Sequence, residues 1–323
     1  MRAIVFTGAG GNEVVTLEER PDPIPAGDEV LLGVRYAALN GADLAQRLGR
    51  YPAPPGSPAD VPGIETSGKV IACGPTARRF RVGERVFGLV GGGGLADRVL
   101  VHERHATGVP SNLDDRSAAA VPEVFVTAHD ALVSQAGMRL GELVVVTGAN
   151  GGVGTAALQI AAVAGARVIA TARSTETCAR LAELGAEAIA PEQLVERASE
   201  LGGADVVLEL VGSPNLEADF RALATKGRIV IVGTSAGDVA SISLGTLMAK
   251  RGRLIGTVLR SRPLEEKAAA VQAFARELVP HLASGRIVPL VDRVLPAEDA
   301  TGAAFDRMHE PGKLGKVLLD FGG

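Results

Sequence analysis

Aromatic residues make up only 3% of this chain of 323 residues, and tryptophan is absent. Basic residues are also not in excess: 33 Lys and Arg stand against 37 Asp and Glu, which gives a formal net charge of -4 at pH 7. Proteins that bind nucleic acids use basic patches and aromatic stacking platforms. The composition therefore argues against a nucleic-acid partner.

Cysteine is nearly as scarce, because Cys73 and Cys178 are the only two and no Cys-x-x-Cys motif exists. Such widely separated thiols exclude a disulfide framework and are typical of a reducing compartment. No apolar stretch is long enough to span a bilayer, and Met1–Phe6 predicts a strand rather than a signal peptide. We expect a cytoplasmic protein with no membrane partner.

The sequence does contain an apolar β-branched run, Val144–Val146, which breaks directly into glycines and then into a helical pattern from Thr155 to Ala164. A strand that leads through glycines into a helix N-terminus forms a pyrophosphate site, because free N–H groups and the helix dipole both face the anion. The spacing is Ala-x-Gly-x-x-Gly, with alanine at the first of the three usual glycine positions. The residues predicted to hold the cofactor here are Gly148, Asn150, Gly151, Gly152, Val153 and Gly154.

The next strand, predicted over 166–171, bears on the choice of nicotinamide cofactor. An NAD site normally places Asp or Glu at the end of this strand to bind the ribose 2′-hydroxyl. Here the strand ends in Ala-Arg-Ser-Thr, and Arg173 with Ser174 suits a 2′-phosphate instead. The alternative is that Arg173 is a solvated loop charge. We expect NADPH rather than NADH.

The rhythm of short apolar runs divides the chain. Before residue 120 they are separated by Pro and Gly clusters, which is typical of an all-β unit of barrel type, with strands expected over 30–34, 68–72, 85–90 and 96–102. From Pro122 strands and helices alternate, with strands near 143–147, 166–171, 205–210, 228–232 and 253–258, which predicts a doubly wound parallel sheet. A helix over Leu264–Ala283 and strands over 288–294 and 316–320 follow. The fold class is α/β, with domains 1–122, 123–260 and a C-terminal return, 261–323, that completes the first.

Several short motifs occur in one order along nearly the whole chain: Ala38–Leu44, Arg47–Pro52, Pro62–Gly68, Val82–Val86, Gly92–Ala96, Pro122–Ala128, the glycine turn, Arg251–Gly252 and Leu259–Arg262. By these motifs the sequence resembles the zinc-independent quinone oxidoreductases of the medium-chain dehydrogenase/reductase superfamily, especially the p53-inducible-gene-3 type. The resemblance implies a GroES-like barrel domain, a Rossmann domain and a nicotinamide bound in the cleft between them.

The resemblance also bears on metal binding. Zinc relatives need thiolate, imidazole and carboxylate ligands at fixed places. The first ligand position is Asn40 here, and the Gly-His-Glu motif appears as Gly-Ile64-Glu. No group of four closely spaced cysteines is present, and the five histidines are scattered. We expect no metal.

The resemblance implies further site residues. Asn40 and Tyr51 line the substrate pocket and orient the acceptor, with a turn residue and a loop aromatic as the plainer alternatives. Thr127 contacts the nicotinamide amide or caps a helix. The remaining predicted cofactor contacts are Val211, Gly212, Gly233, Thr234, Leu259, Arg260, Ser261 and Lys316. For Arg260 the alternative is a surface charge on a dimer-forming edge.

Departures from the family keep the substrate open. Thr177 replaces a frequent lysine, Pro191–Glu192 replaces an adenine-covering Asn-Tyr pair, and Ala45 replaces a pocket tyrosine, which widens the pocket. The first hypothesis is an NADPH-dependent quinone reductase acting on a small molecule. The second is an enone or enoyl reductase of an activated C=C bond, and the third is a non-catalytic, crystallin-like NADPH-binding protein. We expect a homodimer formed through the edge of the Rossmann sheet.

Overall fold

The computed structural model describes residues 1–322 as two compact units. One unit comprises Met1–Val126 together with the segment that begins at Leu259, and the other is Thr127–Val258. The chain therefore leaves the first unit, builds the second, and returns to the first. We describe each unit by itself.

The first unit is built on an antiparallel five-stranded sheet in the order β7-β3-β5-β6-β8. Each of the four strands expected in this region is present, although the bounds differ by up to three residues. β5 begins at Glu65 rather than Gly68 and so includes a buried carboxylate. The strands are β3 (Glu29–Gly33), β5 (Glu65–Cys73), β6 (Arg85–Leu89), β7 (Arg98–His102) and β8 (Ala106–Gly108).

The C-terminal segment completes this unit through a second sheet in the order β15-β16-β4. β16 pairs in parallel with β15 and antiparallel with β4, so residues 318–320 lie beside residues 36–38. A third sheet pairs β1 with β2. The strands are β1 (Arg2–Phe6), β2 (Val15–Glu19), β4 (Tyr36–Ala38), β15 (Val291–Pro296) and β16 (Lys316–Asp320).

The helices of the first unit differ from expectation in one place. The single helix expected over Leu264–Ala283 is wrong, because the structure divides it at Leu278 into α9 and α10. Pro280 causes the break, since it has no N–H to donate and its ring would clash with the carbonyl four residues earlier, that of Arg276. The helices are α1 (Gly41–Arg47), α2 (Asp115–Ala119), α9 (Leu264–Glu277), α10 (Val279–Ala283) and α11 (Ala303–Arg307).

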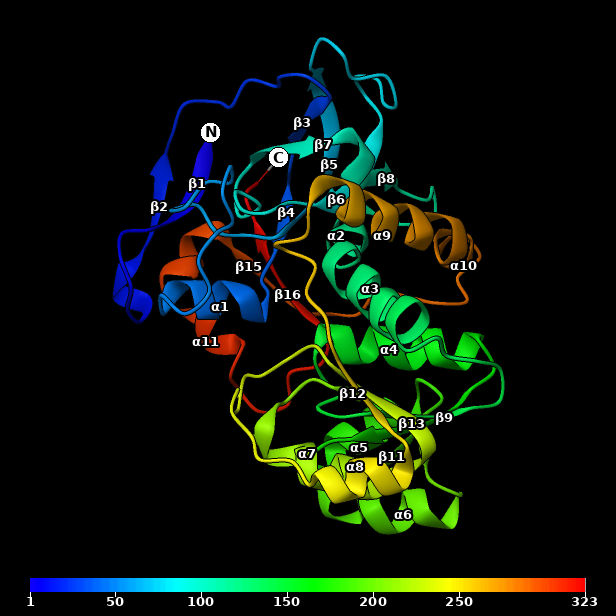
Figure 1. The fold of residues 1–323 in the computed structure, drawn as a ribbon. Coiled ribbons are helices and arrows are strands. Elements are labelled where there is room, and N and C mark those ends of the chain that lie inside the picture. The colour runs from blue at the N-terminus through cyan, green and yellow to red at the C-terminus, as the bar shows by residue number, and fades with distance from the viewer. Residues whose placement is uncertain (323) are drawn as a thin grey trace. The chain divides into compact units, whose positions relative to one another are not determined.

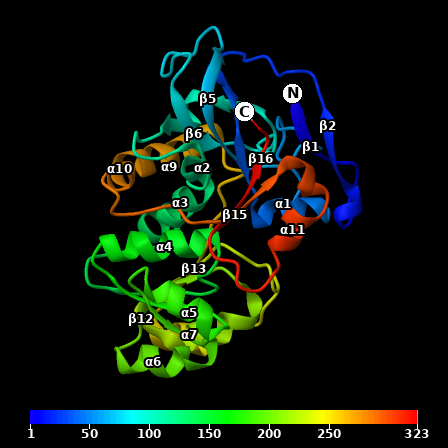
Figure 2. The same ribbon diagram turned by 180° about the vertical axis from the view of Figure 1, so that it is seen from behind.

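Aliphatic side chains from both ends of the chain share one core in this unit. Phe6 near the N-terminus meets Phe305 near the C-terminus edge to face, with ring centroids 5.8 Å apart. The guanidinium of Arg2 lies 5.8 Å from the centre of the Phe321 ring. The blue and red segments accordingly run together in both views (Figures 1 and 2).

The second unit contains a six-stranded, fully parallel sheet in the order β11-β10-β9-β12-β13-β14. The five expected strands are present, which confirms the doubly wound sheet. The edge strand β11 was not expected, because it has three residues and none of them is buried. The strands are β9 (Leu143–Val146), β10 (Arg167–Thr171), β11 (Glu187–Ile189), β12 (Ala204–Glu209), β13 (Leu223–Ile231) and β14 (Arg253–Gly256).

Helices cover both faces of this sheet, with α4 on one side and α6 and α7 on the other (Figure 2). α3 runs from the first unit into the second and continues as a π-helical turn, Asp130–Gln135. None of the helices in residues 1–322 has the length and apolar character needed to cross a membrane. The helices are α3 (Pro122–His129), α4 (Gly152–Val163), α5 (Thr175–Ala182), α6 (Leu194–Glu200), α7 (Leu216–Ala222) and α8 (Leu244–Lys250).

Candidate functional site

The glycine turn of the second unit joins β9 to α4, as the sequence predicts. The helix begins at Gly152, three residues before the expected start, and Gly151 precedes it without a side-chain cap. A Cβ atom on Gly154 would come within 2.5–2.6 Å of the Ala149 backbone, so a larger residue could not fit there. The glycine lets the helix approach its strand closely and leaves the first N–H groups facing outward, which is the geometry of an anion site.

Two other predicted cofactor turns follow neighbouring strands of the same sheet. Val211–Gly212 follows β12, and Gly233–Thr234 follows β13. Gly212 has a φ of +113°, and a Cβ there would lie 2.3 Å from the Gly237 carbonyl oxygen. Since the carboxyl ends of parallel strands share one edge, these two turns and the glycine turn lie on the same rim, where doubly wound sheets bind their ligands. We refer to residues 147–154, 211–212 and 233–234 as the rim.

Glu209, the last residue of β12, connects these turns, and the sequence analysis missed it. Its Oε1 accepts hydrogen bonds from the backbone N–H groups of Val211 and Gly212, each at 2.6 Å. Its Oε2 accepts one from the Thr147 hydroxyl at 2.8 Å. The side chain is fully buried. The one available signal was an acidic residue that directly follows the apolar run 206–208.

A second buried acid lies beside Glu209. Asp219 on α7 is fully buried, and no donor among the described residues reaches either of its carboxyl oxygens. The charge that acts on it is that of the Glu209 carboxyl group. Burial, followed by the negative charge of Glu209, raises the pKa of Asp219 to about 9. Asp219 is therefore protonated at neutral pH.

The predicted 2′-phosphate contacts follow β10, as expected. Arg173 and Ser174 are both exposed. The Ser174 hydroxyl accepts a hydrogen bond from the Thr177 N–H at 3.1 Å and so caps α5. Exposure leaves the Arg173 guanidinium accessible to an anion, and it equally fits the alternative of a solvated charge. The role of Arg173 stays a prediction.

Thr127 is buried inside α3 rather than at the beginning of a helix. The alternative that it caps a helix is therefore wrong, because α3 already begins five residues earlier, at Pro122. The apolar residues Val124–Val126, taken as a stretch before the helix, are part of it. Contact of Thr127 with the nicotinamide amide stays a prediction.

In the first unit, Asn40, Glu65 and Lys316 form a buried polar cluster from three distant parts of the sequence. The Lys316 ammonium donates to Asn40 Oδ1 at 2.6 Å, to Glu65 Oε1 at 2.7 Å and to the Leu39 carbonyl at 2.8 Å. The Asn40 amide donates to Glu65 Oε1 at 2.7 Å and to the Ala38 carbonyl at 3.3 Å. Glu65 Oε2 accepts from the Glu123 N–H at 2.8 Å.

This cluster bears on two predicted roles. All three hydrogens of the Lys316 ammonium and both hydrogens of the Asn40 amide already have protein partners. Contact of Asn40 with an acceptor, or of Lys316 with the cofactor, stays a prediction and requires one of these bonds to be exchanged. The cluster was not expected as such, because the sequence does not show that residues 40, 65 and 316 meet.

Asp43 on α1 fixes the backbone next to Asn40. It is fully buried, and its carboxylate accepts the N–H groups of Asn40 at 2.8 Å and Gly63 at 2.9 Å. Burial raises the pKa of Asp43 to about 6, against the lowering effect of these two bonds and of the charges of Lys316 and Arg260. The carboxylate thereby fixes the start of α1 to the turn before Ile64.

Tyr51 lies in the loop after α1, held by Arg260. The Arg260 guanidinium stacks 5.1 Å from the centre of the Tyr51 ring and donates to the Tyr51 carbonyl at 3.1 Å. It also donates to Gln46 Oε1 at 2.5 Å and to the Gly91 carbonyl at 2.8 Å. Burial raises the pKa of the Tyr51 phenol, so it is neutral at physiological pH. Among the described residues none forms a hydrogen bond with its hydroxyl, which leaves that group available.

The alternative that Arg260 is a surface charge is wrong, since only 4% of the residue is exposed. Of its predicted neighbours at the site, Leu259 is buried and Ser261 is exposed. The Arg260 carbonyl accepts from Lys267 at 2.8 Å, which fixes the backbone at the start of the returning segment. A direct cofactor contact by these three residues stays a prediction.

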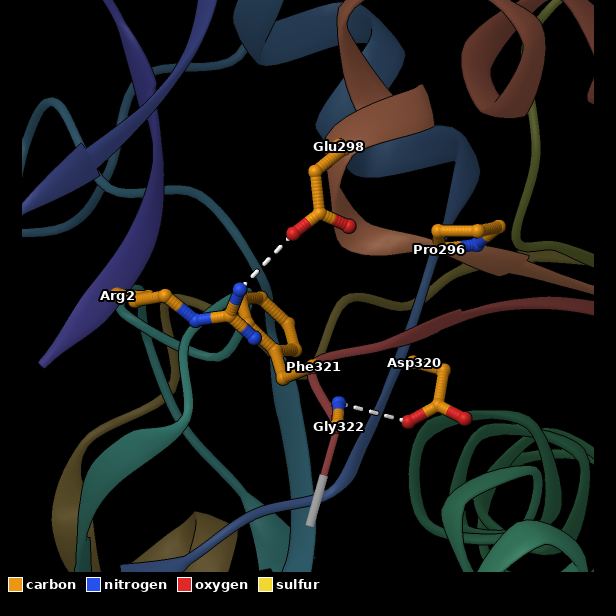
Figure 3. Close-up of a pocket in the computed structure, with 6 residues that line it drawn as sticks. All are labelled: Arg2, Pro296, Glu298, Asp320, Phe321 and Gly322. Atoms are coloured by element: carbon orange, nitrogen blue, oxygen red, sulfur yellow. Dashed lines mark hydrogen bonds and ion pairs between the residues drawn. The ribbon is translucent and has the colours of Figure 1, made fainter.

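A pocket of about 320 Å³ also lies in the first unit, but none of the predicted site residues lines it. Figure 3 shows it between the N-terminal strand and the chain end, where Arg2 and Glu298 form an ion pair of 2.9 Å. Its lining is Arg2, Pro296, Glu298, Asp320, Phe321 and Gly322. The pocket is open to solvent and lined by exposed charged residues, so it does not indicate a function.

Comparison with known proteins gives full-length likenesses. The family described as alcohol dehydrogenase GroES-like domain matches residues 26–111, and the one described as zinc-binding dehydrogenase matches residues 152–276. A quinone oxidoreductase of Rattus norvegicus is 33% identical over 327 residues, covering 99% of this chain and 97% of the relative. An acryloyl-coenzyme A reductase of Sulfurisphaera tokodaii is 28% identical and covers 99% of both chains.

Solved structures agree with these matches. The structure of the quinone oxidoreductase from Thermus thermophilus, described together with its NADPH complex, superposes with a TM-score of 0.86 at 35% identity. The match covers 99% of this chain and 100% of that one. Particular closeness to the p53-inducible-gene-3 type stays a prediction. The two-part architecture, a GroES-like portion and a Rossmann-type sheet, is confirmed.

Proposed function

Because the chain belongs to the quinone oxidoreductase family of the medium-chain dehydrogenases/reductases, we propose that it is an NADPH-dependent reductase of quinones or similar electron-poor small molecules. The observation that carries the proposal is the rim of the second unit, where three turns follow adjacent parallel strands. Bound NADPH supplies the hydride in such a reaction. The protein residues bind, orient and exclude water.

The rim fits a dinucleotide by its shape. At Gly154 and Gly212 a side chain would collide with neighbouring backbone, so these glycines let the turns pack closely against their neighbours. The N-terminus of α4, which is 12 residues long, points its unpaired N–H groups outward. Gly148, Asn150, Gly151, Gly152 and Val153 would hold the pyrophosphate.

Arg173 and Ser174 would select NADPH through the 2′-phosphate, because no carboxylate stands at the end of β10 to repel it. One charge-assisted contact is worth about 1.5–3 kcal/mol, which corresponds to roughly tenfold discrimination or more. Arg173→Ala should therefore raise the Kd for NADPH about tenfold and leave that for NADH unchanged. Fluorescence titration of both cofactors measures this. Equal wild-type affinities for NADPH and NADH, or an unchanged NADPH affinity in the variant, would refute the selection.

Tyr51 would orient the acceptor. Its phenol is neutral and its ring is fixed by Arg260, so the hydroxyl can donate to a carbonyl oxygen without a cost in loop ordering. The Asn40 amide would also donate to the acceptor if it gave up its hydrogen bond to the Ala38 carbonyl, which at 3.3 Å is the longer of its two. Thr127, Gly233, Thr234 and the residues at 259–261 would complete the nicotinamide end.

The first unit would work without zinc. The Lys316 ammonium is bonded to both Asn40 and Glu65, so a divalent cation that used these two residues would have to displace an existing positive charge. Ile64 offers no ligand at the adjacent position. Among residues 1–322 no group of three or more potential His, Cys, Asp or Glu ligands is gathered for a metal.

The protein would form a homodimer through β14. This strand is the edge of the six-stranded sheet, and unpaired edges invite pairing with another chain. Exposed apolar side chains surround it: Leu254 is 38% exposed, Val258 46% and Met248 75%. Light scattering on a size-exclusion column should give twice the chain mass for the wild type and a smaller species for Leu254→Glu. A monomeric wild type would exclude this interface.

A reductase of activated C=C bonds is the second candidate, favoured by the likeness to an acryloyl-coenzyme A reductase. NADPH oxidation measured with ortho- and para-quinones, enones and enoyl thioesters separates the two. A quinone reductase should be fastest with the quinones. Binding of NADPH without turnover of any acceptor would support the third possibility, a non-catalytic cofactor-binding protein.

A further inference from the structure

We propose that Glu209 and Asp219 form a buried acid pair that holds the rim in its NADPH-binding shape, so that the pair sets cofactor affinity without touching the cofactor. The inference rests on the proposed cofactor function of the rim. Glu209 is a positioning residue in this account, and Asp219 keeps its carboxylate in place.

Glu209 reaches all three turns of the rim. Its side chain accepts the Thr147 hydroxyl before the glycine turn and two N–H groups of the turn after β12. Its backbone carbonyl accepts the N–H groups of Val232 at 3.0 Å and Gly233 at 3.2 Å, at the turn after β13. Since Glu209 is fully buried, its bonds fix position more firmly than those of an exposed residue would.

Thr147 adds a second hydrogen bond between the end of β9 and the segment after β12. Its hydroxyl oxygen accepts the Leu210 N–H at 3.0 Å while its hydrogen goes to Glu209. Asn215 adds a further donor to Glu209 Oε2 at 3.2 Å. The carboxylate thus collects donors from the end of β9 and from the segment after β12, and a neutral side chain could not accept all of them.

Asp219 explains how so buried a carboxylate is tolerated without a cation. No described donor reaches the Asp219 oxygens, and Glu209 is the charged group that acts on them. Two neighbouring buried carboxyl groups cannot both be ionised at low cost, so one of them keeps its proton. Glu209 already receives the N–H and hydroxyl donors, so the proton belongs to Asp219.

The other charged groups on elements packed against α7 are either exposed or bonded to partners other than Asp219. Glu196, Glu200 and Lys226 are exposed. The remaining four bond to other partners: Asp205 to the Leu143 N–H, Arg197 to Glu187, Arg228 to Glu142 and Lys250 to the Leu223 carbonyl. Glu209 is therefore the charge that acts on Asp219.

The first experiment replaces the carboxylate by an amide of the same shape. Glu209→Gln keeps only one acceptor oxygen, so its NH2 group must face the donors on one side of the former carboxylate, and the Kd for NADPH should rise by about tenfold or more. Asp205→Asn is the matched control, because Asp205 lies on the same strand at its other end. Its NADPH affinity should stay within about twofold of wild type, which is a difference of a few tenths of a kcal/mol. Both are measured by fluorescence titration and by thermal unfolding of the cofactor-free protein.

The second experiment follows pH. Above about pH 9 Asp219 loses its proton, the two carboxylates repel each other, and the wild-type Kd for NADPH should rise. Asp219→Asn cannot ionise, so this alkaline rise should disappear. Its NADPH affinity at pH 7 should remain within a few-fold of wild type. A merely structural role for Asp219 would lower stability at every pH and would leave the shape of the profile unchanged.

The free protein gives an independent readout. Between about pH 4 and pH 9 the folded chain retains a proton on Asp219 that the unfolded chain has released. The wild-type unfolding temperature should therefore fall with rising pH relative to Asp219→Asn across this window. Parallel pH profiles for the two proteins, or unchanged NADPH affinity in Glu209→Gln, would overturn the inference while the proposed function stands. Failure of the wild type to bind NADPH would instead overturn the proposed function.

Discussion

Removal of the Lys316 ammonium should destabilise the first unit by several kcal/mol. The side chains of Lys316 and Glu65 are only 4% and 1% exposed, so Lys316→Met leaves the Glu65 charge buried without its counter-ion. Two neutral donors, the Asn40 amide and the Glu123 N–H, would remain on Glu65. Breaking a buried pair from one side typically costs about 3–5 kcal/mol. We expect a loss of that size.

The double variant Lys316→Met/Glu65→Gln tests the reason for the loss. It removes the uncompensated charge, so it should be clearly more stable than Lys316→Met alone, although the bonds to Leu39 and Asn40 are still missing. Lys69→Met is the control, since Lys69 lies on the same strand as Glu65 but is exposed. Urea unfolding followed by circular dichroism measures all three. A loss below about 1 kcal/mol for Lys316→Met, typical of an exposed pair, would refute the argument.

Three further predictions concern the same unit. Tyr51→Phe should lower kcat little with quinones but strongly with enones, because an enolate needs the proton more than a hydroquinone anion does. Tyr51→Ala should raise KM for both classes of acceptor. Loss of all quinone turnover in Tyr51→Phe, with NADPH still bound, would indicate that Tyr51 is an obligate acid. Asp43 has a folded pKa of about 6 against 3.8 when unfolded, so its contribution is fully present below about pH 4 and is lost as the pH rises through 6. The unfolding free energy of the wild type should therefore fall between about pH 4 and pH 6, by up to about 1.4 kcal/mol per pH unit, and that of Asp43→Asn should lack this fall. Denaturant unfolding between pH 4 and 7 measures it, and an equal dependence on pH in the two proteins would contradict the prediction. Elemental analysis should find far less than one zinc per chain, with activity insensitive to chelators, and a stoichiometric zinc would show that Asn40 and Ile64 do not prevent binding.

Much of the fold could be predicted because its signals are local. The run Val144–Val146 followed by glycines fixes a strand, a turn and a helix without reference to any distant residue. The same holds for β16, predicted with its observed bounds. Errors arose where the signal was short or a breaker was overlooked: β11 has three residues, and Pro280 divides an otherwise continuous amphipathic pattern.

The site was harder to predict because its bonds join distant residues. Lys316 and Glu65 lie 251 positions apart, and nothing in either segment shows that they meet. Glu209 was missed because an acidic residue at a strand end is ordinarily exposed. The structure shows that Glu209 is buried, as are Thr147 and Asp219. The alternative that Thr127 caps a helix failed because the apolar residues 124–126 do not show that the helix already begins at Pro122.

The return of the chain to the first unit constrains how the protein folds during synthesis. β4 obtains its neighbour β16 only when residues 318–320 have been made, whereas Thr127–Val258 can complete its own sheet earlier. Contacts between such distant residues are slow to form, because a long loop must close before they contribute. Until then Glu65 lacks its counter-ion Lys316, and β4 lacks the strand with which it pairs. Deletion of the last eight residues of the chain would therefore prevent the first unit from folding, since it removes Lys316 and the whole of β16 together.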